Sequence, residues 1–144
     1  MRFLFVCTGN TCRSPMAERL ARRLYPQHEW HSAGVMPTYD IQPMTVQVIE
    51  ESGADASGFE GTDIGDLNLS SFDHVILIGE TARNYTGRVP EKVGRHIWYI
   101  FDPYNAVGTD DERLQIYRDV RDEIHSHIAE LARELDLGEA LARQ

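Results

Sequence analysis

The chain has 144 residues, of which 42% are hydrophobic and 26% charged, an ordinary composition for one globular domain spanning residues 1–144. Its net charge of −9 argues against nucleic acid or an anionic membrane as the main partner. No stretch approaches the roughly eighteen apolar residues of a membrane span, and the apolar N-terminal stretch is too short for a signal peptide. Two cysteines cannot build a disulfide framework, so we expect a reducing, cytoplasmic setting.

The first expected element is a strand over residues 3–6, a short apolar run typical of a buried parallel strand. A loop from Cys7 to Ser14 follows, and small and apolar residues then recur at helical spacing. Ser14 is placed either to cap this helix or to donate a hydrogen bond to the Cys7 sulfur, and Pro15 suits the first helical position.

The loop between this strand and helix has the composition of an anion site. Such a loop presents free backbone N–H groups and the positive end of the helix dipole. Cys7 at its start is a candidate nucleophile, since a helix N-terminus and a nearby cation stabilise a thiolate. Arg13 can bind two phosphate oxygens, and Asn10 tolerates left-handed backbone. The candidate phosphate-binding residues are Thr8, Gly9, Asn10, Thr11, Cys12 and Ser14.

The rest of the chain alternates strands and helices. Further strands are expected over residues 30–33, 72–79 and 96–101. Further helices are expected from Pro43 to about residue 51, over residues 81–85, and from a capping box at Thr109 to about residue 135. This alternation predicts an α/β three-layer sandwich with a central four-stranded parallel sheet, whose ligand lies beyond the carboxyl ends of the strands.

Asp102 directly follows the fourth expected strand and so emerges at the same edge as Cys7. A carboxylic acid there can protonate a leaving phenolate and then activate water, although an Asp-Pro pair also initiates ordinary turns. Tyr39 and Tyr104 are placed to form walls of the entrance. No Cys/His pattern has the spacing of a zinc site, His96 has no partner at a recognisable spacing, and we expect no cofactor.

The run FLFVCTGNTCRSPMAE, residues 3–18, resembles the signature of the low-molecular-weight protein tyrosine phosphatase superfamily, which also contains the thioredoxin-coupled arsenate reductases. The resemblance continues through residues 32–34, residues 102–104 and the C-terminal helix, and it implies the fold of that superfamily. It also implies that Cys7 is the nucleophile, that Arg13 binds the oxyanion and that Asp102 is the general acid. Cys12, a second loop cysteine as in the family's phosphatases, either resolves an oxidised Cys7 or packs beneath the loop.

Three functions are consistent with this resemblance. The first is hydrolysis of phosphotyrosine or aryl phosphates through a phosphocysteine, on a phosphorylated protein or a small molecule. The second is arsenate reduction, because residues 78–80 and 120–124 look more like the arsenate reductases. No cysteine follows Cys12, so an external thiol would have to complete that reduction. The third is a non-catalytic phosphate-binding module, which is disfavoured because Cys7, Arg13 and Asp102 are all present.

A metal site is suggested by resemblance alone. Asn10, Glu18, Ser32 and Asp63 resemble positions that hold potassium in some arsenate reductases, but Glu18 and Asp63 are equally well explained as surface residues. We therefore assign no metal. A monomer is the default expectation for a chain this small and acidic.

Overall fold

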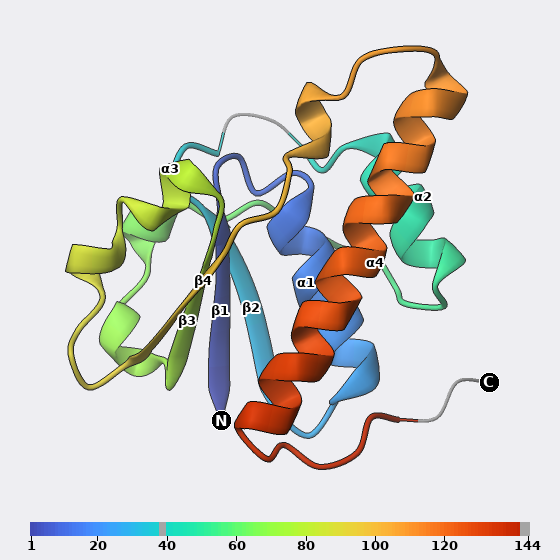
Figure 1. Ribbon diagram of the computed structural model, residues 1–144. Coiled ribbons are helices and arrows are strands. Elements are labelled where there is room, and N and C mark those ends of the chain that lie inside the picture. Colours follow the sequence, from blue (N-terminus) through green and yellow to red (C-terminus); the bar gives the residue numbers. More distant parts are fainter. Residues whose placement is uncertain (38–39, 142–144) are drawn as a thin grey trace.

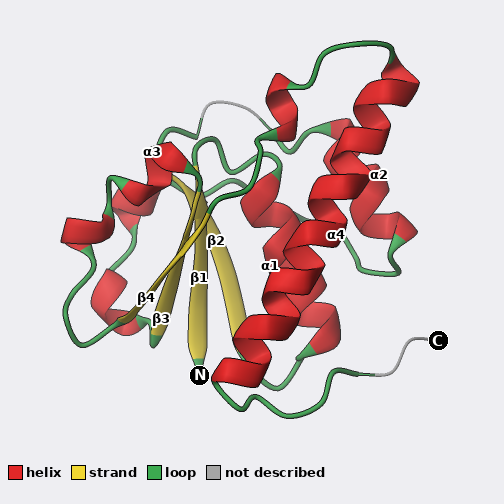
Figure 2. Ribbon diagram, in the orientation of Figure 1, coloured by secondary structure: helices red, strands yellow, loops and turns green. Residues whose placement is uncertain are grey.

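The computed structural model describes residues 1–37 and 40–141, and its strands form one parallel sheet with the order β2-β1-β3-β4 (Figure 1). The strands are β1 (Arg2–Cys7), β2 (Glu29–Gly34), β3 (His74–Ile78) and β4 (Gly94–Trp98). The α-helices are α1 (Arg13–Leu24), α2 (Pro43–Glu51), α3 (Glu80–Arg83) and α4 (Asp110–Glu134). Figure 2 shows α1, α2 and α4 on one side of the sheet and α3 with short 3₁₀ helices on the other. The predicted three-layer α/β sandwich is confirmed.

Strand β1 lies inside the sheet and is buried on both faces. Phe3 and Phe5 join the apolar core beneath α1 and α4, whereas Leu4 and Val6 join a second core on the α3 side. Successive side chains of a strand point to opposite faces, so a strand covered on both sides reads as a continuous apolar run. This burial fixes Cys7, the last residue of β1, at the carboxyl edge of the sheet.

Helix α4 begins where the sequence predicts. The Thr109 hydroxyl accepts a hydrogen bond from the Glu112 backbone N–H, and the Glu112 carboxylate accepts one from the Thr109 N–H. An apolar stripe at helical spacing then packs against the core: Tyr117, Val120, Ile124, Ile128 and Leu131. No helix in the described ranges is long and apolar enough to cross a membrane.

Two local predictions at the sheet edge are wrong. Strand β4 ends at Trp98 rather than at residue 101, because its partner β3 ends at Ile78, the residue paired with Trp98. Beyond this end, the Ile100 carbonyl accepts a hydrogen bond from Arg13. Helix α1 begins at Arg13 with Cys12 as its cap residue, and no side chain caps it. Pro15 is thus its third residue, where the missing N–H costs nothing because first-turn N–H groups lack helical partners.

Candidate active site

The phosphate-loop candidate, residues 8–12, connects the end of β1 to the start of α1. Backbone hydrogen bonds from later segments hold this loop and the end of β1. The carbonyls of Cys7 and Thr8 accept from the N–H groups of Val35 and Met36, and the Thr11 carbonyl accepts from the Gln42 N–H. Among the described residues, no backbone carbonyl accepts a hydrogen bond from the N–H groups of residues 8–12. These donors are therefore available to an anion at the N-terminus of α1.

The Cys7 sulfur lies 2.9 Å from the Ser14 hydroxyl oxygen. Of the two predicted roles for Ser14, the contact with sulfur is the one present, and the capping role is wrong. Asn10 supports this contact, because its side-chain amide nitrogen donates a hydrogen bond to the Ser14 oxygen at 2.8 Å. Its backbone adopts a φ of 56°, the left-handed region that the sequence predicts an asparagine to tolerate there.

Arg13 is 5% exposed, and its guanidinium reaches the edge of the sheet beside Asp102. One terminal nitrogen donates to the Ile100 carbonyl at 2.9 Å; the other lies 3.4 Å from the Thr8 hydroxyl and 3.4 Å from the Asp102 carboxylate. Gly79 makes room for the group: its φ is +92°, and a Cβ there would overlap the guanidinium. A planar cation held in this way suits two-point binding of a tetrahedral oxyanion.

Asp102 projects its carboxylate over this edge from the start of the 3₁₀ helix Pro103–Asn105. One of its oxygens accepts from the Tyr104 N–H at 3.1 Å, and the other faces Arg13. The Asp-Pro pair does initiate a turn, and that turn holds the carboxylate against the guanidinium. The structure thus brings Arg13 and Asp102 together, and it places Cys7 against Ser14, the residue that follows Arg13 in the chain.

A cavity of about 420 Å³ opens beside Arg13 and Asp102. Its rim includes Tyr99 and Phe101, which are 60% and 56% exposed and which the sequence prediction missed. Tyr104, the predicted wall, is exposed but is not among the lining residues. Tyr39, the other predicted wall, lies outside the described residues. The remaining lining residues are Thr8, Gly79, Glu80, Thr81, Ile100 and Asn105.

Cys12, like Cys7, belongs to the apolar core and is not among the residues that line the cavity. Its sulfur lies 3.7 Å from the Tyr117 hydroxyl and 3.7 Å from the Thr11 hydroxyl. Burial raises the pKa of the Cys12 thiol, and burial and Cys12 itself raise the pKa of Tyr117. Cys7 and Cys12 are both free thiols in this structure.

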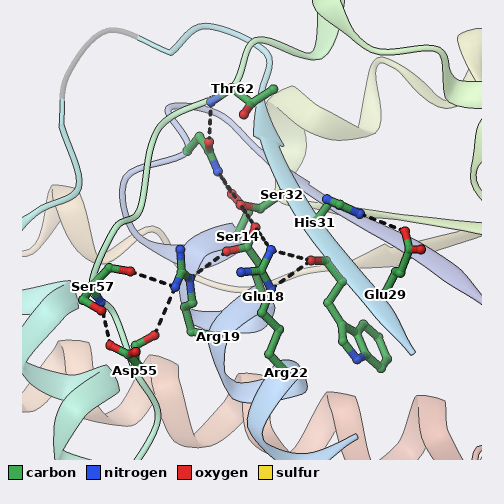
Figure 3. A network of polar contacts seen from close by, with 12 residues as sticks. Ser14, Glu18, Arg19, Arg22, Glu29, His31, Ser32, Asp55, Ser57 and Thr62 are labelled. Carbon is green, nitrogen blue, oxygen red and sulfur yellow. Dashed lines mark hydrogen bonds and ion pairs between the residues drawn. The ribbon is translucent and has the colours of Figure 1, made fainter. Parts of the chain in front are cut away.

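Hydrogen bonds join three of the four residues with a potassium-site resemblance, and Figure 3 labels two of them, Glu18 and Ser32. Ser32 donates to the Glu18 carboxylate at 3.1 Å, and Asn10 donates to the Ser32 oxygen at 3.1 Å. Glu18 is 5% exposed, not a surface residue, and it pairs with Arg19. Asp63 instead accepts from the Gly65 N–H. Within residues 1–37 and 40–141, no group of three or more His, Cys, Asp or Glu residues could hold a metal.

Comparison with known proteins assigns the family. The family model for low molecular weight phosphotyrosine protein phosphatase matches residues 2–141, so the chain belongs to this family of enzymes. An arsenate reductase of Bacillus subtilis (strain 168) is 37% identical over 131 residues, covering 89% of this chain and 92% of that protein.

Two solved structures show the same fold. The tyrosine phosphatase Wzb from Escherichia coli K30, in complex with sulphate, superposes with a TM-score of 0.79 at 26% identity, covering 93% of this chain and 97% of Wzb. The YwlE arginine phosphatase from Geobacillus stearothermophilus superposes with a TM-score of 0.74 at 29% identity, covering 94% of this chain and 92% of YwlE. The predicted membership of the superfamily is confirmed.

Proposed function

We propose that the protein hydrolyses phosphomonoesters through a phosphocysteine on Cys7. One observation carries this proposal: the Asp102 carboxylate lies 3.4 Å from the guanidinium of Arg13, at the mouth of a loop whose nucleophile contacts Ser14. A nucleophile, an oxyanion clamp and a proton donor are the groups that a two-step phosphoryl transfer needs.

In the first step the Cys7 thiolate attacks phosphorus and the bond to the leaving oxygen breaks. Arg13 and the loop N–H groups bind the three equatorial oxygens, and Asp102 gives its proton to the leaving group. In the second step Asp102, now a carboxylate, takes a proton from water as that water attacks phosphorus. The sulfur–phosphorus bond breaks, which releases inorganic phosphate and restores the Cys7 thiolate.

The substrates that best fit this cavity are aryl phosphates and phosphotyrosine, free or in a protein. Tyr99 and Phe101 at the rim offer apolar faces for an aromatic ring. Phosphoarginine also belongs in the substrate panel, because one structural relative is an arginine phosphatase and Glu80 lines the cavity beside Asp102. A reducing cytoplasm suits an enzyme that depends on a free thiolate.

Arsenate reduction is the second candidate, and the 37% identity to an arsenate reductase favours it. Arsenate is a tetrahedral oxyanion that the same loop could bind, with the Cys7 sulfur displacing one oxygen as water. Two electrons must then come from thiols, and Cys7 and Cys12 are the only cysteines in the sequence. An external dithiol or glutathione would therefore supply the electrons and leave as a disulfide while arsenite is released.

A paired assay distinguishes the two functions. Purified protein is given an aryl phosphate, phosphotyrosine and phosphoarginine, and separately arsenate with glutathione–glutaredoxin or thioredoxin and its reductase. We expect phosphate release from at least one phosphomonoester or phosphoarginine to exceed arsenite formation, and Cys7→Ser to abolish it. Arsenite formation as the faster reaction, with little phosphate release, would replace the first proposal with the second.

A further inference from the structure

A continuous line of buried hydrogen bonds runs from Glu18 on α1 to the Cys7 sulfur, and Figure 3 shows this line as far as Ser14. The Glu18 carboxylate accepts from Ser32 on β2, and Ser32 accepts from Asn10 in the loop. Asn10 also donates to Ser14, whose oxygen lies 2.9 Å from the Cys7 sulfur. The contacts along this line determine which group donates and which accepts in each hydrogen bond.

Glu18 determines the donor and acceptor of the first hydrogen bond, because an ionised carboxylate can only accept. The single hydroxyl proton of Ser32 goes to the Glu18 oxygen at 3.1 Å. Ser32 then has only lone pairs to offer Asn10, so the Asn10 amide must turn its nitrogen, not its oxygen, toward Ser32.

A second contact requires the same orientation of the Asn10 amide. The backbone N–H of Thr62 donates to the Asn10 side-chain oxygen at 3.0 Å. The amide nitrogen therefore faces both serines, and each of its two protons has one acceptor, the Ser32 oxygen or the Ser14 oxygen.

Ser14 receives a proton from Asn10 and keeps its own hydroxyl proton to donate. Two acceptors are near: the Cys7 sulfur at 2.9 Å and the Ala33 carbonyl at 3.4 Å. The shorter contact, to a group that carries negative charge as a thiolate, is the stronger one. The proton therefore points at the sulfur.

We propose that Glu18 is a positioning residue whose carboxylate sets the direction of these hydrogen bonds, through Ser32 and Asn10, so that Ser14 donates to the Cys7 thiolate. The inference rests on the proposed function and adds a residue to it that touches neither the substrate nor the reacting atoms. Arg19 holds the carboxylate in place with an ion pair of 2.8 Å, and it also donates to the carbonyls of Asp55 and Ser57.

Glu18→Gln reverses this direction while changing only one polar atom. Arg19 lies 2.8 Å from one Glu18 oxygen and Arg22 3.6 Å from the other, so the glutamine oxygen turns to the closer Arg19 and its NH₂ faces Ser32. Ser32 then receives a proton from that amide and directs its own toward Asn10, which opposes the Asn10 orientation. Ser32→Ala is the second variant, because it interrupts the line and leaves the Glu18–Arg19 pair intact.

The readout is the pH midpoint of the ultraviolet absorbance of the Cys7 thiolate, taken as the difference from Cys7→Ser. It needs no turnover, so it stays informative even if the proposed activity is wrong. The matched control is Glu51→Gln. Glu51 pairs with two arginines, Arg118 and Arg121, as Glu18 does with Arg19 and Arg22, but it lies on α2 outside this line of hydrogen bonds.

We expect the midpoint to move to higher pH in Glu18→Gln and Ser32→Ala and to stay unchanged in Glu51→Gln. Turnover below the midpoint should fall by about ten- to a hundredfold in Glu18→Gln, the worth of a hydrogen bond to a charged group. If Glu18 acted only as a negative charge through space, its removal would instead move the midpoint to lower pH. In a Ser14→Ala background, Glu18→Gln should have no further effect on the midpoint.

Two results would overturn the proposal. One is a midpoint in Glu18→Gln that is unchanged or lower than in the wild type while thermal stability drops as in Glu51→Gln. The other is a full additional shift when Glu18→Gln is added to Ser14→Ala, because Glu18 would then act by a route that bypasses Ser14.

Discussion

The two cysteines of the loop belong to the same apolar core but differ in their hydrogen-bond partners. Cys7 and Cys12 are each 2% exposed, so burial does not distinguish them. The Cys7 sulfur lies 2.9 Å from the Ser14 hydroxyl at the N-terminal end of α1, whereas the Cys12 sulfur lies 3.7 Å from the hydroxyls of Tyr117 and Thr11. A close hydroxyl partner, not exposure, distinguishes the proposed nucleophile from Cys12, whose thiol pKa is raised by burial.

The largest expected effect separates the two thiols directly. Cys7→Ser should abolish turnover yet still bind phosphate or arsenate, because Arg13 and the loop N–H groups hold the anion without the sulfur. Cys12→Ser should keep measurable turnover because the nucleophile remains. Steady-state rates and calorimetric phosphate binding check both. Near-normal hydrolysis by Cys7→Ser would rule out covalent catalysis at Cys7.

The substitution Asp102→Asn tests whether Asp102 donates a proton to the leaving group in the proposed reaction at Cys7. The rate should fall by roughly 10²–10⁴ for a phenolic leaving group that needs a proton. It should fall less for an activated leaving group that departs as an anion. Rates for a series of aryl phosphates with different leaving groups provide the measurement. An equal loss across the series would mean that Asp102 has another role.

Arg13→Lys should lower the rate by roughly a hundredfold or more, because a point charge cannot bind two oxygens as a planar guanidinium does. Arg118→Lys is the matched control: Arg118 makes a two-point ion pair with Glu51, and neither residue lines the cavity. Comparison of kcat/KM for both variants checks this. Retention of most activity by Arg13→Lys would exclude Arg13 as the residue that binds the substrate oxyanion.

Mild peroxide tests whether the two thiols can react with each other. Oxidised Cys7 forms a sulfenic acid, which the Cys12 thiol can capture as a disulfide with loss of water. We expect wild-type activity to return with a dithiol, and the loss to become irreversible in Cys12→Ser. Activity regained after dithiol treatment is the measurement. Equal recovery by both proteins would show that Cys12 only packs beneath the loop.

The smallest expected effect is on the pH dependence of the free energy of unfolding, and it involves Cys12 and Tyr117 but not Cys7. Burial raises the pKa of both Cys12 and Tyr117, so folding favours their neutral forms. This stabilisation is complete below the ordinary pKa of the thiol and is lost as pH rises through the folded-state value. The free energy of unfolding in urea should therefore fall at alkaline pH, and fall less in Cys12→Ser. An identical alkaline decline in the two proteins would contradict the assignment.

The sequence was sufficient for the parts that local patterns determine. The apolar run of β1, the capping box at Thr109 and the stripe on α4 follow from burial periodicity and terminal hydrogen bonds, and the structure confirms them. Asp102 was expected at the carboxyl edge because parallel strands end there together, and its carboxylate does lie beside Arg13.

The parts that depend on register and on side-chain direction were not predictable. His96 proves to have a partner: its ring nitrogen lies 3.0 Å from that of His74, a contact that arises from the pairing of β3 with β4. Tyr99 and Phe101 are exposed because they follow the end of β4, and that end depends on how far its partner β3 extends. Glu18 looked like a surface residue because its burial depends on Ser32 and Arg19.

A pre-steady-state experiment with an activated aryl phosphate tests the phosphocysteine on Cys7 most directly. Rapid mixing should release a burst of phenolate equal to the enzyme present, followed by slower turnover. Protein quenched during the burst should carry one phosphate, located on Cys7 by mass spectrometry, and Cys7→Ser should give neither signal. Turnover without a burst, together with no phosphate on Cys7 in the quenched protein, would contradict the account.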